Sequence, residues 1–313
     1  MQRFTGPLLP GLLAVLVAVA FVGFLLGDHR SSATARKPRI AAGSGVLLEY
    51  PSTWRPAGGA PSIPGLAIDG SLVLAPGGRA AGAGLLSGRL SAGQSGPLPA
   101  GFVSLLRGLP RTEVVDLANA QAYRYREVHL QGYDRALELY VIPNALEGPS
   151  ALACYASSES SAFMHQCEQT VAQITLPGQS LYALSPDGGY AAQLGKLLAD
   201  LDRQRLALRK EMQVHDTPAE VASLATALAG RFASAAAFIR TLEPPQSAGA
   251  AQAALANSVL NAHDAYEALA TATAAATAGR SREIDAAQAR VSSAEAEVDT
   301  ALENYALLGY GQM

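Results

Sequence analysis

The residues that could do chemistry are few and scattered along the chain. No two histidines have the His-x-x-x-His spacing that places a pair of zinc ligands on one helix face. His263 and Asp264 adjoin, but successive helical residues point about 100° apart, so we expect an exposed polar pair. We predict no catalytic residue, no metal site and no cofactor. The five histidines are His29, His129, His165, His215 and His263.

Other arrangements of reactive residues lead to the same prediction. The sequence contains no Gly-x-Ser-x-Gly elbow, Walker loop or dinucleotide fingerprint. The serine-rich stretch 157–161 contains Glu159 and could mimic a nucleophile loop, but serines before a helix usually cap it. Arg124, Arg126 and Glu138 could pair across strands, which contributes little if the pairs are exposed. We expect no enzyme, and the alternative is a hydrolase whose site assembles only in three dimensions.

Tyrosines gather around one predicted hairpin, at positions 123, 125, 133 and 140. Tyr123 and Tyr125 are two residues apart on a predicted strand, so they share one face of the sheet. That face is either a platform for a ligand or part of the core. Tyr123, Tyr125 and Tyr140 are therefore the candidate ligand-binding residues.

The chain has two cysteines, Cys154 and Cys167. A disulfide between them would close a loop of about 14 residues and stabilise the fold by about 3 kcal/mol in the chain-entropy description. The alternative is two unrelated buried thiols. We predict the disulfide, which requires an oxidising compartment.

The N-terminal region contains an unbroken apolar stretch without charge, residues 8–27. As a helix it is long enough to cross the roughly 30 Å hydrocarbon core of a bilayer. The stretch continues past Ala18-Val19-Ala20, the small residues at which a signal peptide would be cleaved. We predict an uncleaved transmembrane anchor over residues 1–27, with cleavage near Ala20 as the alternative, and therefore membrane lipid as a partner.

The charges beside this stretch and the two cysteines predict opposite orientations. Arg3 precedes the stretch, whereas Arg30, Arg36, Lys37 and Arg39 follow it in a basic linker over residues 28–39. The positive-inside rule would place the C-terminal part in the cytoplasm. The cysteine pair favours the outside, and we give it the greater weight. We therefore predict a single-pass plasma-membrane protein with extracytoplasmic domains.

Composition limits the classes of partner and source. The net charge is −3 and no block of like charge occurs, so we predict no nucleic-acid partner. Few lysines beside abundant arginine, alanine and glycine are typical of GC-rich bacterial genomes. Together with the anchor, this composition indicates a protein of the bacterial cell envelope.

Residues 40–177 alternate short strands with turns, which predicts an α+β domain with an antiparallel sheet. In residues 136–142, apolar and polar residues alternate as in a half-buried strand. A short helix is predicted over 99–109 and an amphipathic helix over 160–174, which the disulfide would join to the last strand. The predicted strands cover 45–50, 71–75, 83–90, 113–117, 121–130, 136–142 and 150–155.

The first of these strands, which contains Val46-Leu47-Leu48-Glu49, runs into Tyr50-Pro51-Ser52-Thr53-Trp54. This motif, with the strands and closing helix that follow, resembles the opening of PsbP-like domains, which are antiparallel α/β sandwiches. The resemblance covers roughly residues 40–177. It implies an accessory or binding domain and transfers no catalytic residue. We expect Trp54 to anchor the core, because aromatic side chains bury large areas.

After a linker over residues 178–189, the chain becomes alanine-rich with a helical period. Helices are predicted over 190–212, from 217, around 255–269 up to Gly279, and over 284–308. Thr217-Pro218-Ala219-Glu220 is a capping box that starts the second helix. Short turns between four helices predict an up-down-up-down bundle over residues 190–313.

Leu242-Glu243-Pro244-Pro245 is followed by two long alanine-rich helices and a closing Leu308-Gly309-Tyr310. This pattern, over roughly residues 215–310, resembles helical modules of actinobacterial envelope proteins of unassigned function. The resemblance implies a cell-envelope setting. We expect a non-enzymatic binding or scaffold protein that associates with itself or with another protein through the bundle. The alternative is a small-ligand sensor domain whose occupancy alters the association of the bundle.

Overall fold

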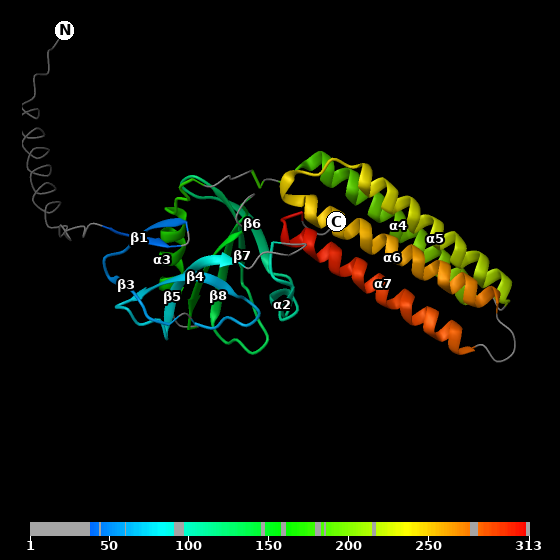
Figure 1. Cartoon of the computed structure of the whole chain (residues 1–313), viewed down its shortest axis with the longest axis horizontal. Helices are drawn as coiled ribbons and strands as arrows, with labels where there is room; N and C mark the ends of the chain where they lie inside the picture. The colour runs from blue at the N-terminus through cyan, green and yellow to red at the C-terminus, as the bar shows by residue number, and fades with distance from the viewer. Residues whose placement is uncertain are drawn as a thin grey trace, which may run out of the picture.

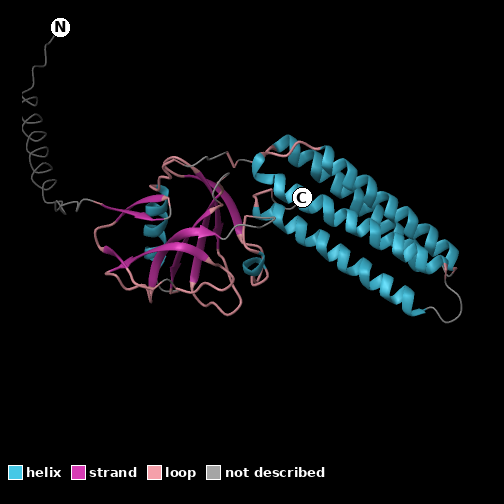
Figure 2. Ribbon diagram, in the orientation of Figure 1, coloured by secondary structure: helices cyan, strands magenta, loops and turns pink. Residues whose placement is uncertain are grey.

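The computed structural model describes residues 38–43, 45–59, 61–90, 97–144, 148–157, 161–178, 183–184, 186–214, 217–275 and 281–310. The predicted anchor over residues 1–27 lies outside the described residues, as do residues 28–37 of the linker, His29 and His215. Within the described part, strands occupy one end of the molecule and four long helices extend from it (Figures 1 and 2).

Seven strands form one antiparallel sheet in the order β3-β4-β5-β9-β8-β7-β6, which confirms the α+β class. A two-stranded sheet, β1 (Arg39–Gly43) and β2 (Val46–Tyr50), precedes it. A single helical turn, α2 (Ala100–Val103), follows β5. The large sheet consists of β3 (Trp54–Pro56), β4 (Ile68–Pro76), β5 (Ala83–Leu90), β6 (Arg111–Asp116), β7 (Gln121–Arg126), β8 (Ala136–Ile142) and β9 (Ser150–Ala156).

Several predicted boundaries were wrong. β7 ends at Arg126 and not at residue 130, because Glu127 has a φ of 54° and turns the chain out of the strand. The helix predicted over 99–109 is limited to α2. β1 and β3 were missed because they are short and are stabilised by pairing with distant residues rather than by their own pattern.

One face of the large sheet packs against helix α3 (Ser161–Ala172) and β2. Trp54 is fully buried there and stacks on Phe163, with 5.0 Å between ring centroids, so its predicted role as a core anchor is confirmed. Cys154 of β9 and Cys167 of α3 lie at disulfide-bonding distance, with Cα atoms 6.1 Å apart. This pair connects α3 to the centre of the sheet, as predicted.

The four long helices are α4 (Gly188–Val214), α5 (Pro218–Thr241), α6 (Gly249–Ala274) and α7 (Ser281–Leu307), with a 3₁₀ turn, η1 (Gln246–Ala248), before α6. Each packs against the next in chain order. The predicted capping box is confirmed, since the Thr217 hydroxyl accepts a hydrogen bond from the backbone N–H of Glu220 at 3.3 Å.

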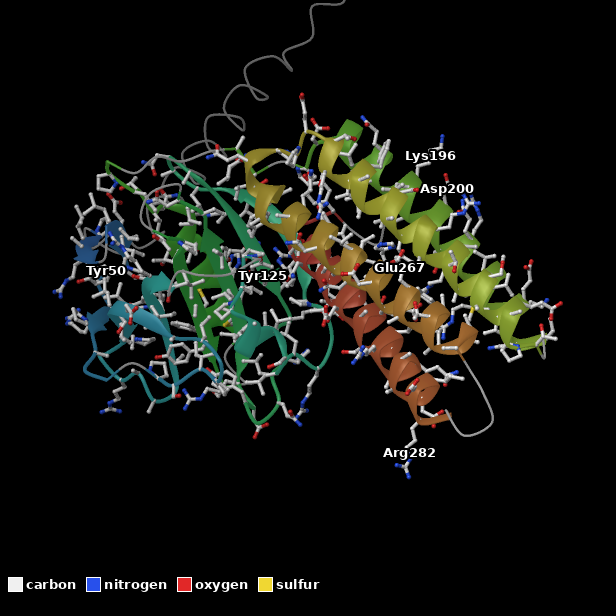
Figure 3. All side chains as sticks on the ribbon, turned by 45° about the vertical axis from the view of Figure 1, so that its right-hand side comes forward. Tyr50, Tyr125, Lys196, Asp200, Glu267 and Arg282 are labelled. Atoms are coloured by element: carbon white, nitrogen blue, oxygen red, sulfur yellow. A yellow bond between two sulfur atoms is a disulfide. The ribbon has the colours of Figure 1, made fainter. Side chains whose placement is uncertain are left out.

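The other face of the sheet packs against the end of these helices. The buried residues of this face and those of the helices form one continuous core. The Tyr125 hydroxyl donates a hydrogen bond to the Leu307 carbonyl (2.9 Å), and the Leu184 N–H donates one to the Gln121 side chain (2.8 Å). Figure 3 shows Tyr125 at this boundary, whereas Tyr50 lies on the far side of the sheet from the helices. The two parts therefore pack as one body.

Among the described residues, one helix, α5, is long and apolar enough to span a membrane. Helices in the core of a protein satisfy the same criterion, and α5 packs between α4 and α6. Its length and composition therefore decide nothing about a membrane.

Candidate functional site

A groove in the described surface lies between the two outer helices, α4 and α7. These helices have little direct contact with each other, although each packs on its neighbour in sequence. The apolar stripe of α4 is consequently only partly covered: Leu194 and Leu201 are buried, whereas Leu198, Leu208 and Met212 are half-buried. The groove therefore has apolar walls, and α5 and α6 form its floor.

The half of the groove nearer the sheet is a pocket of about 330 Å³. Leu198 and Leu201 of α4 face Val298 and Leu302 of α7 across it, and Phe232 of α5 lies at the bottom. Three charged residues complete the lining: Asp202, Arg205 and Asp299. An apolar hollow with a few polar groups at the edge has the general character of a binding site.

The other half is a second pocket, of about 340 Å³. Its lining is more polar than that of the first, because Arg209, Gln213, Gln288 and Ser292 lie beside the apolar residues. The apolar and aromatic part of the lining consists of Met212, Val221, Tyr266, Leu269 and Val291.

A buried carboxylate separates the two pockets. Glu295 of α7 accepts hydrogen bonds from the Tyr266 hydroxyl of α6 (2.7 Å) and from Nη1 of Arg209 of α4 (2.6 Å). Nη1 of Arg205 lies 4.0 Å from the same carboxylate. Burial and the hydrogen bond to Glu295 raise the pKa of Tyr266 well above its usual value, so its hydroxyl stays a neutral donor. This bridge is the main side-chain connection across the middle of the groove.

The outer helices meet at the end that touches the sheet. The hydroxyls of Tyr190 on α4 and Tyr305 on α7 lie 2.7 Å apart, and Tyr190 also donates to the Gln252 side chain of α6 (3.0 Å). The ring of Tyr310 packs edge-on against both tyrosines. Burial raises the pKa of Tyr190 and of Tyr305, which keeps both neutral. The groove is thus closed at its sheet end by a tyrosine cluster.

The walls of the groove carry opposite charge. Helix α4 contains five basic and three acidic residues, a net charge of +2, counted over Gly188–Val214. Helix α7 contains two basic and six acidic residues, a net charge of −4, over Ser281–Leu307. Of the charged residues that line the two pockets, α4 contributes Asp202, Arg205 and Arg209, whereas α7 contributes Asp299.

The tyrosines proposed from the sequence as ligand-binding residues lie elsewhere. Tyr123 and Tyr125 share a face, as expected, but both are fully buried where the sheet meets the helices. Tyr140 lies on the opposite face, under α3, and donates a hydrogen bond to Glu138 at 2.9 Å. The structure therefore brings together two of the three candidates.

In the charged cluster beside Tyr140, Arg124 and Glu138 are buried, whereas Glu168 is partly exposed. Arg124 Nε donates to Glu138, and Arg124 Nη1 lies 2.6 Å from a Glu168 oxygen on α3. Burial lowers the pKa of Arg124, but the hydrogen bonds to Glu138 and Glu168 outweigh that effect and raise it overall. This cluster holds α3 on the sheet and has its acids and bases paired with one another.

The sequence predicts that His263 and Asp264 on α6 form an exposed pair, but only one of the two side chains is exposed. Asp264 is exposed, but His263 is largely buried, with Nδ1 3.0 Å from the Ala229 carbonyl of α5. The two side chains approach to 3.8 Å. Among the described residues, no group of three or more His, Cys, Asp or Glu side chains is placed to hold a metal ion.

No protein-family model, curated protein or solved structure matches this chain. The resemblances to PsbP-like domains and to actinobacterial helical modules therefore receive no support from relatives. The groove must be interpreted from its own geometry.

Sequence reasoning did not identify the groove, although one signal for it is present. Glu295 lies between Val291 and Val298 on the apolar stripe of α7, where a buried charge requires a partner. The sequence pattern alone does not show that the partners are Arg209 and Tyr266.

Proposed function

We propose that this protein is a single-pass, membrane-anchored binding or scaffold protein of the bacterial cell envelope, with its folded part outside the membrane. In this proposal the groove between α4 and α7 is the docking surface. The observation that supports it is the hollow between the two helices, where Leu198, Met212 and Leu302 remain half-buried. Binding sites in proteins are commonly concave hollows of this kind, with apolar walls and a few polar groups.

The proposed location depends on other features. The apolar stretch over residues 8–27 supplies the anchor, and the pairing of Cys154 with Cys167 favours an oxidising compartment. The α/β domain, which we compare with PsbP-like domains on its Tyr50–Trp54 motif, would support the helices rather than act on a substrate.

The experiment is an intact-mass measurement on full-length protein isolated from bacterial membranes, with thiol alkylation before and after reduction. We expect the mass of residues 1–313, two hydrogens light, with alkylation only after reduction. Free thiols would place the folded part in the cytoplasm and contradict the proposal. A mass lacking about the first 20 residues would show cleavage and remove the anchor.

The same membranes test the orientation directly. Protease added to intact spheroplasts should degrade the folded part, whereas a cytoplasmic marker protein stays intact. A reaction with turnover by the purified protein would contradict the non-enzymatic part of the proposal.

A further inference from the structure

The uncovered edge of the helical part continues beyond the two pockets. Leu206 of α4 is 58 % exposed, one of the most exposed large apolar side chains of the described residues. It lies one helical turn from Asp202 and close to Arg209, both of which line the groove. The apolar lining and this rim residue together form a single face, which we call the α4–α7 face.

Opposite charges make the α4–α7 face complementary to itself. If two copies meet through it about a two-fold axis parallel to the helices, α4 of each copy lies against α7 of the other. Both of these contacts then join a helix of net charge +2 to one of net charge −4. Complementary charge favours this arrangement and disfavours the pairing of like helices.

In this arrangement, charged residues of α4 and α7 lie at matching positions along the helix axes. We call the position along the axis the height of a residue. Glu295 contacts both Arg205 and Arg209, so on α4 its height corresponds to about residue 207. Because α4 and α7 run in opposite directions, Arg203 and Asp299 lie at about the same height. A two-fold axis parallel to the helices preserves height, so Arg203 faces Asp299 of the partner subunit.

A second pair of residues follows the same relation. Lys196 lies within about one turn, or 5.4 Å, of the height of Glu303. Lys196, Arg203, Asp299 and Glu303 are all exposed in the single chain. Figure 3 shows Lys196 projecting from α4 away from the helical core.

The face is also large enough for a stable contact. A helix of 27 residues is about 40 Å long, and two adjacent helices are about 20 Å wide. The resulting footprint of about 800 Å² per copy equals that of a standard specific interface. The arrangement puts the α/β domains of both copies at one end, so both proposed anchors can enter one membrane.

We propose that the occupant of the groove is a second copy of this chain, and that α4 and α7 of the two copies form an intermolecular four-helix layer. This inference rests on the proposed function and names the partner. In this dimer the second copy covers the apolar walls of both pockets and Leu206.

The test uses two charge-reversed variants of the full-length protein in detergent. One is Lys196→Glu/Arg203→Glu on α4, and the other is Asp299→Lys/Glu303→Lys on α7. Light scattering after size exclusion should give a dimer for the wild type. Each variant alone places like charges against each other at both contacts, so self-association should weaken by about tenfold or more. A 1:1 mixture restores opposite charges at both contacts and should recover the dimer mass.

A matched control reverses exposed charges away from the face. Arg231→Glu on α5 and Glu267→Lys on α6 should leave the dimer unchanged, because neither residue lines the groove. Circular dichroism of every variant checks that the fold is retained. Recovery of the dimer in the mixture would in any case exclude misfolding as the cause.

Three results would overturn the dimer. The first is a wild-type protein that stays monomeric at about 100 µM, a concentration far above the Kd of a standard interface. The second is a dimer that persists in both charge-reversed variants. The third is a mixture of the two variants that stays monomeric. A monomer that co-purifies with bound lipid would identify an amphiphile as the occupant. The proposed function is tested separately, because a monomer with an oxidised cysteine pair and an intact anchor would leave it standing.

Discussion

The hydroxyl of Tyr125 on β7 donates a hydrogen bond to the carbonyl oxygen of Leu307 at the end of α7, at a distance of 2.9 Å. Both residues are fully buried. Tyr125→Phe would keep the packing but leave a buried carbonyl without this donor, so we expect a loss of about 1 to 3 kcal/mol in the free energy of unfolding. Urea denaturation monitored by circular dichroism measures it.

Tyr133→Phe is the matched control for this substitution. The Tyr133 hydroxyl is buried and has no hydrogen-bond partner among the described residues. Its removal should therefore leave the stability unchanged or raise it slightly. Equal losses in the two variants would show that the bond to Leu307 does not connect the two parts of the molecule.

The buried pair of Arg124 and Glu138 gives a second prediction. Their side chains are 7 % and 10 % exposed. Glu138→Gln leaves the guanidinium without its closest counter-charge in a buried position, so we expect a loss of about 3 to 5 kcal/mol. Asp200→Asn breaks the exposed pair with Arg203 and should change stability by less than about 1 kcal/mol. Equal losses of unfolding free energy for both substitutions in urea denaturation would show that burial does not determine the contribution of these ion pairs.

Reduction of the cysteine pair should weaken the fold without abolishing it. Cys154 and Cys167 are 13 residues apart, and a crosslink of that span stabilises by about 3 kcal/mol. A reducing agent should therefore lower the urea midpoint of the wild type. The variant Cys154→Ala/Cys167→Ala should be less stable and indifferent to the reducing agent. A wild type that is also indifferent would mean that the pair contributes nothing.

Acid should destabilise the attachment of α3 through Glu168. The hydrogen bond from Arg124 holds the pKa of Glu168 below its usual value of 4.5. The carboxylate therefore contributes stability above about pH 4.5, and this contribution is lost as the pH falls through the lowered pKa. Unfolding measured between pH 7 and pH 3 should show a shallower loss for Glu168→Gln than for the wild type. Parallel curves would contradict this role.

Local signals predicted the helices well. Thr217 and Glu220 form a cap that depends on four consecutive residues, so the start of α5 could be derived from them alone. The positions of Trp54 and of the cysteine pair also followed from residue type and spacing.

Predictions that depend on contacts between residues far apart in the sequence were less accurate. The alternation in β8 predicted one polar face, yet Glu138 and Tyr140 are buried because α3 and Arg124 cover them. The four helices and their short turns likewise predict an up-down-up-down bundle, in which the first and last helices are neighbours. How closely α4 approaches α7 depends on contacts between residues far apart in the sequence, such as Tyr190 and Tyr305, which are 115 residues apart. The sequence pattern does not encode such long-range geometry locally.

The continuous core shared by the sheet and the helices has a consequence for synthesis. Tyr125 and Leu307 are separated by 182 residues, which a ribosome adds in about 10 to 40 s. During that interval the apolar face of the sheet lacks the end of α7 that packs against it. Packing of this face of the sheet can therefore be complete only once α7 has been synthesised.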